Sequence, residues 1–271
     1  FPLRNHLIRR YIRRYATECV TVSLELQSAL LANGIKCSRY VHNGIDVDKF
    51  KTTPTHVDKF VKRHNLGAKK VVLFGGRLSY LKGGDHLVKA MKRVVARVPE
   101  AVLLVLGSED GYTQHLRSLA QSLGISHSFV SAGWLSGAEL RAAYGASQIV
   151  VTPSICFDTF PTINLEAMAM SKPVIATCFG GSKELVVHGE TGFVVNPLNV
   201  DSLASKITKL LLDDEKAKRM GEMGYRRVVK DFKLKDCARR YVDILERLKI
   251  DHIGLDTTRG RANSGEPPKI P

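Results

Sequence analysis

The sequence predicts an α/β fold built on a parallel β-sheet, because two kinds of segment alternate along most of the chain. From residue 71 onward, short runs rich in Val and Ile alternate with longer segments whose apolar residues repeat at the helical period. The 271 residues are 44% hydrophobic and 25% charged, which is a globular composition. Disorder throughout the chain is therefore excluded, and the length allows one large domain or two small ones.

Six segments have the composition of buried strands, since each is short and rich in β-branched residues. They lie near residues 71–75, 101–106, 129–132, 148–152, 173–177 and 193–195. Because helical patterns separate them, the sequence favours a sheet whose strands run parallel.

Helices are predicted between and after these strands. One is indicated by six apolar residues at the helical period before Pro99, namely Leu87, Val88, Met91, Val94, Val95 and Val98. Ser136 and Glu139 form a capping box for a helix that runs to about Gly145. The last helices, rich in Leu, Lys and Arg, are expected near 200–212, 214–230 and 235–250.

The first forty residues do not continue this alternation. Their patterns predict a strand at 19–23, a helix at 25–32 that ends at Asn33-Gly34, and a second strand at 39–42. We therefore expect residues 1–42 to be the end of a preceding domain. Residues 251–271 lose the helical pattern and contain several Gly and Pro, so they are predicted to form a disordered tail.

The chain carries an excess of positive charge, with 41 Lys and Arg against 26 Asp and Glu, which gives a net charge of +15. Five cations and no carboxylate lie in the first fifteen residues, at Arg4, Arg9, Arg10, Arg13 and Arg14. Apolar side chains lie between them at helical spacing. This pattern is typical of a solvated helix face or of a basic amphipathic helix on anionic lipid. Nucleic acid is disfavoured as a partner, because no reader motif is present.

Several classes of protein and site are excluded. No apolar run approaches the roughly 20 residues needed to span a bilayer, and the first fifteen residues are too rich in Arg for a signal peptide. We therefore expect a cytoplasmic protein, with peripheral contact at the inner membrane surface as an open alternative. The cysteines form no C-x-x-C pair and the histidines no H-E-x-x-H or H-x-H cluster, so no metal site is expected.

A glycine-rich segment follows the first predicted strand, at residues 74–84. In open α/β sheets, ligands bind at the carboxyl ends of the strands. Gly75 and Gly76 let backbone amides approach an anion, and Arg77 and Lys82 can neutralise phosphate oxygens. The segment matches neither the P-loop pattern nor G-x-G-x-x-G, which disfavours a P-loop NTPase or a dinucleotide oxidoreductase. The alternative is that Arg77 and Lys82 are ordinary surface cations.

A second segment follows the fourth predicted strand, at residues 153–170. Pro161 suits the first turn of a helix, whose positive N-terminus would face a ligand beyond the strand. Asp158 in the preceding loop and Glu166 on the second helical turn can then face the same ligand. A carboxylate accepts two hydroxyl hydrogen bonds, which suits the diols of a ribose or a hexose. The alternative is a loop Asp and a solvated helix Glu.

These two segments, taken with three others, resemble a known family. The others are Asn43-Gly44-Ile45-Asp46, Cys178 to Glu184, and His188 to Val195. Together they are similar to the nucleotide-sugar lobe of retaining glycosyltransferases of family 4, over roughly residues 18 to 248. The resemblance implies the GT-B fold, in which this C-terminal lobe is a Rossmann-like, doubly wound parallel sheet.

The resemblance also implies site residues. Arg77, Lys82 and Asp158 would form the catalytic set. The two cations would hold the donor diphosphate, and Asp158 stands at the first glutamate of the family's E-x7-E motif, which contacts the donor sugar. Glu166 would accept hydrogen bonds from the ribose hydroxyls. The other donor-binding residues implied are Gly75, Gly76, Gly107, Trp134, Leu135, Phe160, Pro161, Thr162 and Ile163.

Two positions depart from the family's pattern. Asp158 is one methylene shorter than the glutamate, and Phe160-Pro161 replaces the commoner phenylalanine-glycine pair, which removes one amide donor. Trp134 would lie where such enzymes bind the base, while a tryptophan that fills the core remains the alternative.

The implied domains are the end of the N-terminal, acceptor-binding lobe at 1–42, a nucleotide-sugar-binding lobe at 43–234 and a crossover helix at 235–250. The intact enzyme is expected to transfer a sugar from a nucleotide diphosphate donor to a hydroxyl acceptor with retention, and without metal or other cofactor. The expected acceptor is a carbohydrate or a lipid-linked glycan, in cell-surface polysaccharide or glycolipid synthesis. Two alternatives remain open: a nucleotide-sugar epimerase of the same fold, and a non-catalytic lobe that binds nucleotide sugars.

Overall fold

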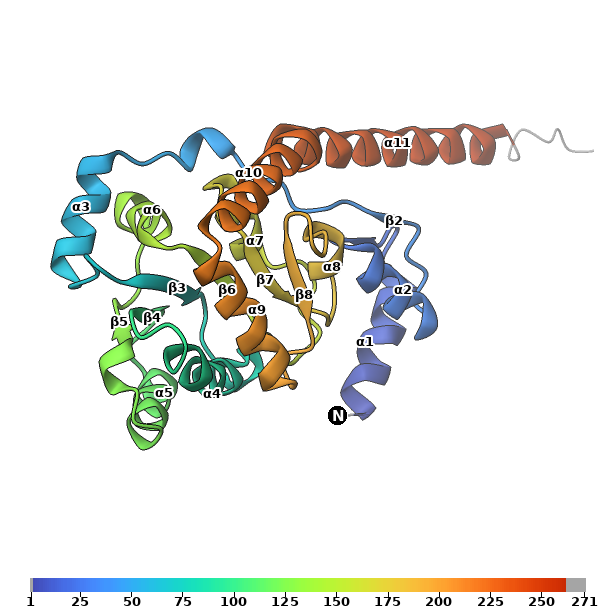
Figure 1. Ribbon diagram of the computed structural model, residues 1–271. Coiled ribbons are helices and arrows are strands. Elements are labelled where there is room, and N and C mark those ends of the chain that lie inside the picture. Colours follow the sequence, from blue (N-terminus) through green and yellow to red (C-terminus); the bar gives the residue numbers. More distant parts are fainter. Residues whose placement is uncertain (1, 262–271) are drawn as a thin grey trace, which may run out of the picture.

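The computed structural model describes the backbone of residues 2–261 and the side chains of residues 6–249. Within this part of the chain, six strands form one parallel sheet (Figure 1). They are β3 (Lys70–Gly75), β4 (Ala101–Leu106), β5 (Phe129–Ser131), β6 (Ile149–Thr152), β7 (Val174–Thr177) and β8 (Gly192–Val195). The six strands predicted from the sequence are confirmed, with ends that differ by about one residue.

The order of the strands across this sheet is β5-β4-β3-β6-β7-β8. The chain builds from β3 to one edge, returns to the middle, and builds from β6 to the other edge. At this reversal the connections after β3 and β6 diverge, which opens a crevice at the carboxyl ends of the two strands. Segments 74–84 and 153–170 lie on the two sides of that crevice.

Helices cover both faces of the sheet, so it is doubly wound (Figure 1). One face carries α4 (Gly84–Val95), α5 (Gly111–Ser122) and α9 (Val200–Leu212). The other face carries α3 (Pro54–Arg63), α6 (Gly137–Ala146) and α7 (Thr162–Ala169). α10 (Asp214–Asp231) packs against α7 and α9, and the short α8 (Ser182–Leu185) follows β7. The expected α/β architecture is confirmed.

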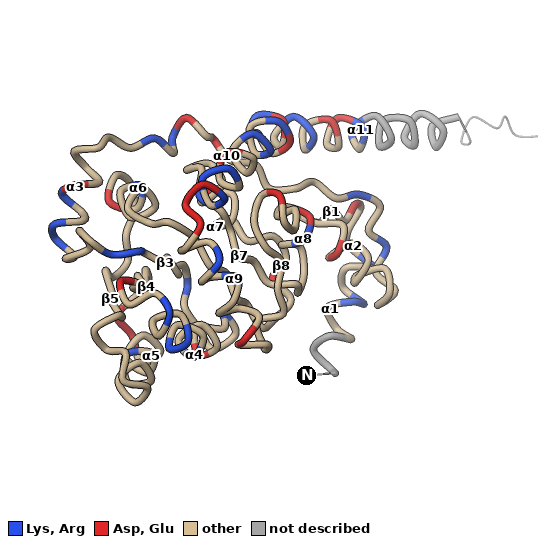
Figure 2. Tube along the Cα trace, viewed as in Figure 1, with Lys and Arg blue, Asp and Glu red and all other residues tan. Residues whose placement is uncertain are grey.

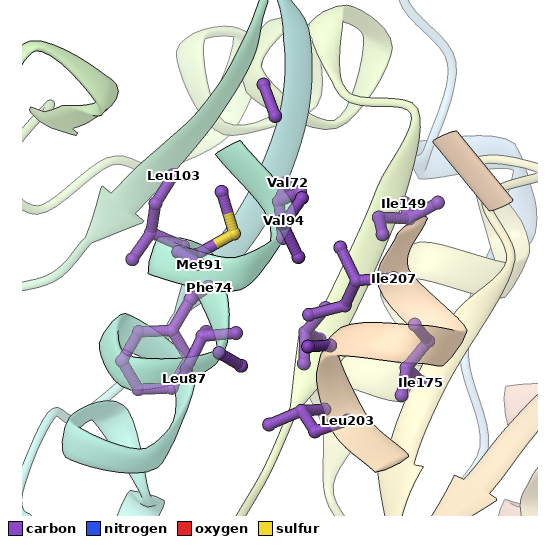
Figure 3. Packing of buried hydrophobic residues seen from close by; sticks show 14 of the residues in the cluster. Val72, Phe74, Leu87, Met91, Val94, Leu103, Ile149, Ile175, Leu203 and Ile207 are labelled. Carbon is purple, nitrogen blue, oxygen red and sulfur yellow. The ribbon is translucent and has the colours of Figure 1, made fainter. Parts of the chain in front are cut away.

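Alternate residues of each strand enter two separate hydrophobic cores. In β3, Val72 and Phe74 belong to the core beneath α4 and α9, whereas Val71 and Leu73 belong to the core on the other face. Figure 3 shows the side chains of α4 and α9 that meet over the strands. Because both faces are covered, the strand interiors are continuously apolar and do not alternate apolar with polar residues.

α3 and α5 are absent from the sequence prediction, although both carry a start signal. Thr53 caps α3 by accepting a hydrogen bond from the N–H of His56, and Pro54 is its first residue. Asp110 caps α5 by accepting from the N–H groups of Tyr112 and Thr113. These two caps were the signals that could have located the helices.

The helix expected after Ser136 is confirmed as α6, but the expected capping box is not formed. Ser136 is the N-cap residue with an extended backbone, yet its side chain makes no cap hydrogen bond. Glu139 pairs instead with Arg63 of α3, at 2.8 Å. A contact with a neighbouring helix thus replaces the local bond that the pattern predicts.

The first forty residues stand beside the main sheet rather than within it (Figure 1). After α1 (Pro2–Tyr15), β1 (Val20–Thr21) and β2 (Arg39–Tyr40) pair in parallel as a separate two-stranded sheet, with α2 (Leu24–Ala32) between them. Both strands are shorter than predicted, whereas the helix ends as predicted, with Asn33 as its C-cap and Gly34 at φ +70°. No residue of α2 is fully buried.

α11 (Leu234–Arg261) is longer than the helix expected at 235–250 and extends away from the main sheet (Figure 1). Residues 251–261, which the sequence analysis assigned to the tail, continue this helix. No proline interrupts the chain before Pro267, so no residue in this stretch forces the helix to end. The rest of the expected tail, 262–271, lies outside the described residues.

Lys and Arg are spread over most helices, with Asp and Glu among them (Figure 2). The excess of positive charge is therefore not confined to α1. None of the described helices combines the length with the apolar character that a membrane span requires.

Replacing Leu203 of α9 by Ala is expected to destabilise the domain by about 2–5 kcal/mol, because a cavity would be left between this helix and the sheet. Leu203 is fully buried in the core beneath α4 and α9 (Figure 3). Leu212 on the same helix is 63% exposed, so Leu212→Ala is the matched control. The control should change the free energy of unfolding by less than about 0.5 kcal/mol. Urea unfolding measures both values, and equal losses would contradict this packing.

Candidate functional site

The crevice between β3 and β6 holds two adjoining cavities. The first has a volume of about 310 Å³ and the second a volume of about 250 Å³. Five residues at their common border line both: Gly75, Gly76, Arg77, Thr162 and Ile163. A ligand with two chemically different parts can therefore extend from one cavity into the other.

Every residue that the sequence predicts for the site lines one of these cavities. Besides the five shared residues, the first is lined by Lys82, Asp158, Phe160 and Pro161. The second is lined by Gly107, Trp134, Leu135 and Glu166. The fold thus brings these predicted residues together around the two adjoining cavities.

Gly83 allows the loops after β3 and β6 to touch. Its φ is +74°, and a Cβ placed on it would lie 1.9 Å from the carbonyl oxygen of Pro153. The N–H of Ile155 donates to the carbonyl of Leu81 at 2.9 Å across the same contact. No residue with a side chain fits at position 83 without moving one loop. The contact sets the position of Lys82 in relation to the loop that carries Asp158.

Lys82 and Asp158 form an ion pair in the first cavity. The Lys82 Nζ atom lies 2.6 Å from the Asp158 Oδ2 atom. The Ser154 hydroxyl donates to the same oxygen at 3.2 Å. Both contacts thus fall on Oδ2 and hold the carboxylate in one orientation. The sequence analysis treated Lys82 and Asp158 as separate contacts and did not identify Ser154.

Arg77 differs from Lys82, because among the described side chains it has neither an ion pair nor a hydrogen bond. It is exposed at the border of the two cavities. Its guanidinium group is therefore available to an anionic ligand that spans both.

Glu166 is held by a residue that the sequence analysis missed. The hydroxyl of Tyr144, a fully buried residue of α6, donates to the Glu166 Oε2 atom at 2.7 Å. Burial raises the pKa of Glu166 above its usual range, and the hydrogen bond from Tyr144 lowers that pKa in part. Burial also raises the pKa of Tyr144 well above 10, and the nearby carboxylate raises it further, so the hydroxyl keeps its proton. No local motif pointed to Tyr144, because α6 and α7 meet only in the folded protein.

The N-terminus of α7 points at the border of the two cavities. The helix begins at Thr162, one residue later than predicted, and Pro161 is its N-cap residue. Thr162 and Ile163 line both cavities, and the first N–H groups of a helix have no partner within it. Pro161 itself has no N–H to offer. This border therefore combines backbone donors with the partial positive charge of a helix N-terminus.

Trp134 lies at the open side of the second cavity. Its residue is 62% exposed, so the alternative of a tryptophan that fills the core is wrong. The turn that carries it is fixed by the N–H of Gly107, which donates to the carbonyl of Gly133 at 3.0 Å. Leu135 and Leu140 add apolar surface on the same wall.

His42 links the first forty residues to the wall of the first cavity. Its ring stacks on Phe160 with centroids 4.9 Å apart and an interplanar angle of 17°. Its Nε2 atom lies 2.7 Å from the Glu184 Oε2 atom. The carboxylate of Glu184 also accepts from the N–H groups of Leu24 and Glu25 at the start of α2. His42 thus joins the start of α2 to the cavity wall through its stacking and its contact with Glu184.

Comparison with known proteins agrees with this geometry. Residues 57–227 match the model of the family described as glycosyl transferases group 1. The chain belongs to this family. One relative of this glycosyltransferase domain is the uncharacterized glycosyltransferase MJ1607 of Methanocaldococcus jannaschii, 34% identical over 65% of this chain and 45% of the relative.

A second relative is a GDP-mannose-dependent α-(1-6)-phosphatidylinositol monomannoside mannosyltransferase of Mycobacterium tuberculosis. It is 31% identical over 76% of this chain and 55% of its own length. The domain thus spans about half the length of these curated relatives.

Solved structures confirm the GT-B type fold of the glycosyltransferase domain. The crystal structure of Anabaena Alr3699/HepE in complex with UDP-glucose aligns with a TM-score of 0.84, over 89% of this chain and 67% of that chain. The sequence identity is 23%, so this likeness concerns the fold alone.

Replacing Glu166 by Gln is expected to stabilise the glycosyltransferase domain at neutral pH. Burial penalises the charged carboxylate, so the pKa of Glu166 is higher in the folded chain than in the unfolded one. The penalty is present above the raised pKa and disappears as the pH falls below the unfolded value of about 4.3. The gain in Tm for Glu166→Gln should therefore shrink towards zero as the pH is lowered through this range.

Thermal unfolding at a series of pH values measures this gain. Glu190→Gln, at an exposed position outside both cavities, is the matched control and should show no such pH-dependent gain. A Tm of Glu166→Gln below that of the unmodified chain at neutral pH would contradict the assignment of a desolvated carboxylate.

Proposed function

We propose that this glycosyltransferase domain binds a nucleoside diphosphate sugar in the two cavities, and that the intact enzyme transfers the sugar to a hydroxyl group. The observation that carries the proposal is the shared border at Arg77 and the N-terminus of α7. Positive groups lie at that border, and a carboxylate lies in each cavity beyond it. A diphosphate at the border places a nucleoside in one cavity and a sugar in the other.

The second cavity suits the nucleoside. Trp134, Leu135 and Leu140 offer apolar surface to a base, and Gly107 leaves room for close approach. Glu166, oriented by Tyr144, would accept hydrogen bonds from the ribose hydroxyls. One Glu166 oxygen is engaged by Tyr144, and the other oxygen is left for the ribose.

The first cavity suits the β-phosphate and the sugar. Arg77, Lys82 and the N–H groups of α7 would stabilise the negative charge that grows on the diphosphate as the glycosidic bond breaks. Asp158 would accept from a sugar hydroxyl. Because these groups supply the positive charge, the proposed reaction needs neither a metal ion nor another cofactor. Among the described residues, no group of three or more His, Cys, Asp or Glu has the arrangement of a metal site.

The name of one relative supports a hexose donor and a lipid-linked acceptor. The Mycobacterium tuberculosis relative is named for GDP-mannose and a phosphatidylinositol monomannoside. We infer a carbohydrate or lipid-linked acceptor in the synthesis of a glycolipid or surface polysaccharide. Retention of the anomeric configuration is part of the proposal and rests on the motif resemblance.

Contact with an anionic membrane belongs to the same proposal. α1 exposes apolar side chains next to its arginines, and Arg9, Arg10, Arg13 and Arg14 line one hollow along this helix. The exposed apolar residues are Leu7, Ile8, Tyr11 and Tyr15.

The chain is expected to sediment with vesicles that contain phosphatidylglycerol and not with vesicles of neutral phosphatidylcholine. The binding should weaken as salt is added. Equal binding to both kinds of vesicle would contradict this contact.

Replacing Arg77 by Ala is expected to weaken the binding of a nucleoside diphosphate about ten-fold or more, because a charge-assisted hydrogen bond contributes about 1.5–3 kcal/mol. Calorimetric titration with UDP and with GDP measures the affinity. Arg97→Ala is the matched control, since Arg97 is exposed and lies outside both cavities, and it should leave the affinity within about two-fold.

The same titration tests the ribose contact. Glu166→Ala should weaken the binding of ribonucleoside diphosphates and leave the affinity for 2′,3′-dideoxy analogues unchanged.

An Arg77→Ala variant that binds both UDP and GDP as tightly as the unmodified chain would contradict the proposed donor site.

A further inference from the structure

The ion pair between Lys82 and Asp158 lies inside the cavity assigned to the β-phosphate and the sugar. We propose that Asp158 competes with the diphosphate for Lys82, and so makes the site discriminate against the free nucleoside diphosphate in favour of the nucleotide sugar. This inference rests on the proposed function and deepens it. Asp158 would then have a second task, which is to promote release of the nucleoside diphosphate product.

The carboxylate of Asp158 is fixed in place, whereas its partner is flexible. The N–H of Gly181 donates to the Asp158 carbonyl at 2.9 Å, and a Cβ placed on Gly180 would lie 2.2 Å from the same oxygen. Ser154, itself buried, holds the Oδ2 atom. Lys82 is attached through a four-carbon chain that can rotate. A ligand that binds Lys82 must therefore move the ammonium group or share it with Asp158.

The fixed carboxylate acts differently on the two forms of the ligand. The terminal phosphate of a free nucleoside diphosphate has a second pKa of about 6, so it carries nearly two charges at neutral pH. In a nucleotide sugar the same phosphate is esterified and carries one charge. The share of the Lys82 charge that Asp158 takes up is therefore a greater loss to the free diphosphate than to the nucleotide sugar. A sugar hydroxyl can also donate to Oδ1, since both described side-chain contacts of Asp158 fall on Oδ2.

A simpler role for Asp158 predicts the opposite effect. If the carboxylate only holds Lys82 in position for the phosphate, its loss should weaken the binding of every diphosphate. If it competes for Lys82, its loss should tighten the binding of the free diphosphate. The sign of the change in affinity distinguishes the two roles.

The decisive variant is Asp158→Asn, which keeps the shape of the side chain and removes the charge. The full chain is titrated with UDP, UDP-glucose, GDP and GDP-mannose in a calorimeter. Removal of the Asp158 charge should tighten the binding of the free nucleoside diphosphate about three- to ten-fold. The nucleotide sugar should bind equally or more weakly, so that the preference shifts towards the product.

Two controls separate the possible causes. Asp48→Asn removes a carboxylate from another Lys-Asp pair, with Lys51 at 2.7 Å, that is exposed and lies outside both cavities. It should leave all four affinities unchanged. In a Lys82→Met background, the gain from Asp158→Asn should fall to less than half, because no ammonium group is left to compete for.

Weaker or unchanged binding of the free diphosphate by Asp158→Asn would overturn the inference, provided that the unmodified chain binds it. A gain of full size in the Lys82→Met background would also overturn it, because repulsion alone would then explain the result. An unmodified chain that binds none of the four nucleotides would overturn the proposed function as well. A thermal scan of each variant verifies that it is folded. Ser154→Ala, which removes the hydroxyl that holds Asp158, should give a smaller gain in affinity for the free diphosphate.

Discussion

The site depends on one close contact between the loops that follow β3 and β6. Gly83 lies against the carbonyl of Pro153 so closely that its φ of +74° and its missing side chain are both required. The strand order separates the two loops at the reversal between β3 and β6, and this contact brings them together again. Lys82 therefore meets Asp158, although 76 positions separate them in the sequence.

The two carboxylates of the site have different surroundings, and these surroundings suit different ligands. Asp158 is paired with an ammonium group and a hydroxyl on one oxygen. Glu166 has only the hydroxyl of Tyr144 as a described side-chain partner, and burial raises its pKa. The ammonium group beside Asp158 can attract a phosphate, whereas the free oxygen of Glu166 can accept hydrogen bonds from neutral hydroxyls. Two carboxylates eight positions apart in the sequence thus lie in different surroundings.

The wall of the first cavity is also tied to the first forty residues. His42 stacks on Phe160 and contacts Glu184, whose carboxylate caps the start of α2. A displacement of α2 would therefore act on the position of Phe160 through a short chain of contacts. This arrangement gives a physical route by which α2 and the first cavity affect each other.

The sequence by itself determined the six strands, several of the helices and the site residues carried by the two motif segments, because β-branched runs, Gly, Pro and motif spacing are local signals. It did not determine the strand order, the Lys82 to Asp158 pair, or the roles of Tyr144, Ser154 and Glu184. It also predicted a capping box at Ser136, which is not formed, and Glu139 pairs instead with Arg63 of another helix. Each of these was decided by the tertiary structure, since each depends on side chains from segments that meet only when the sheet is assembled.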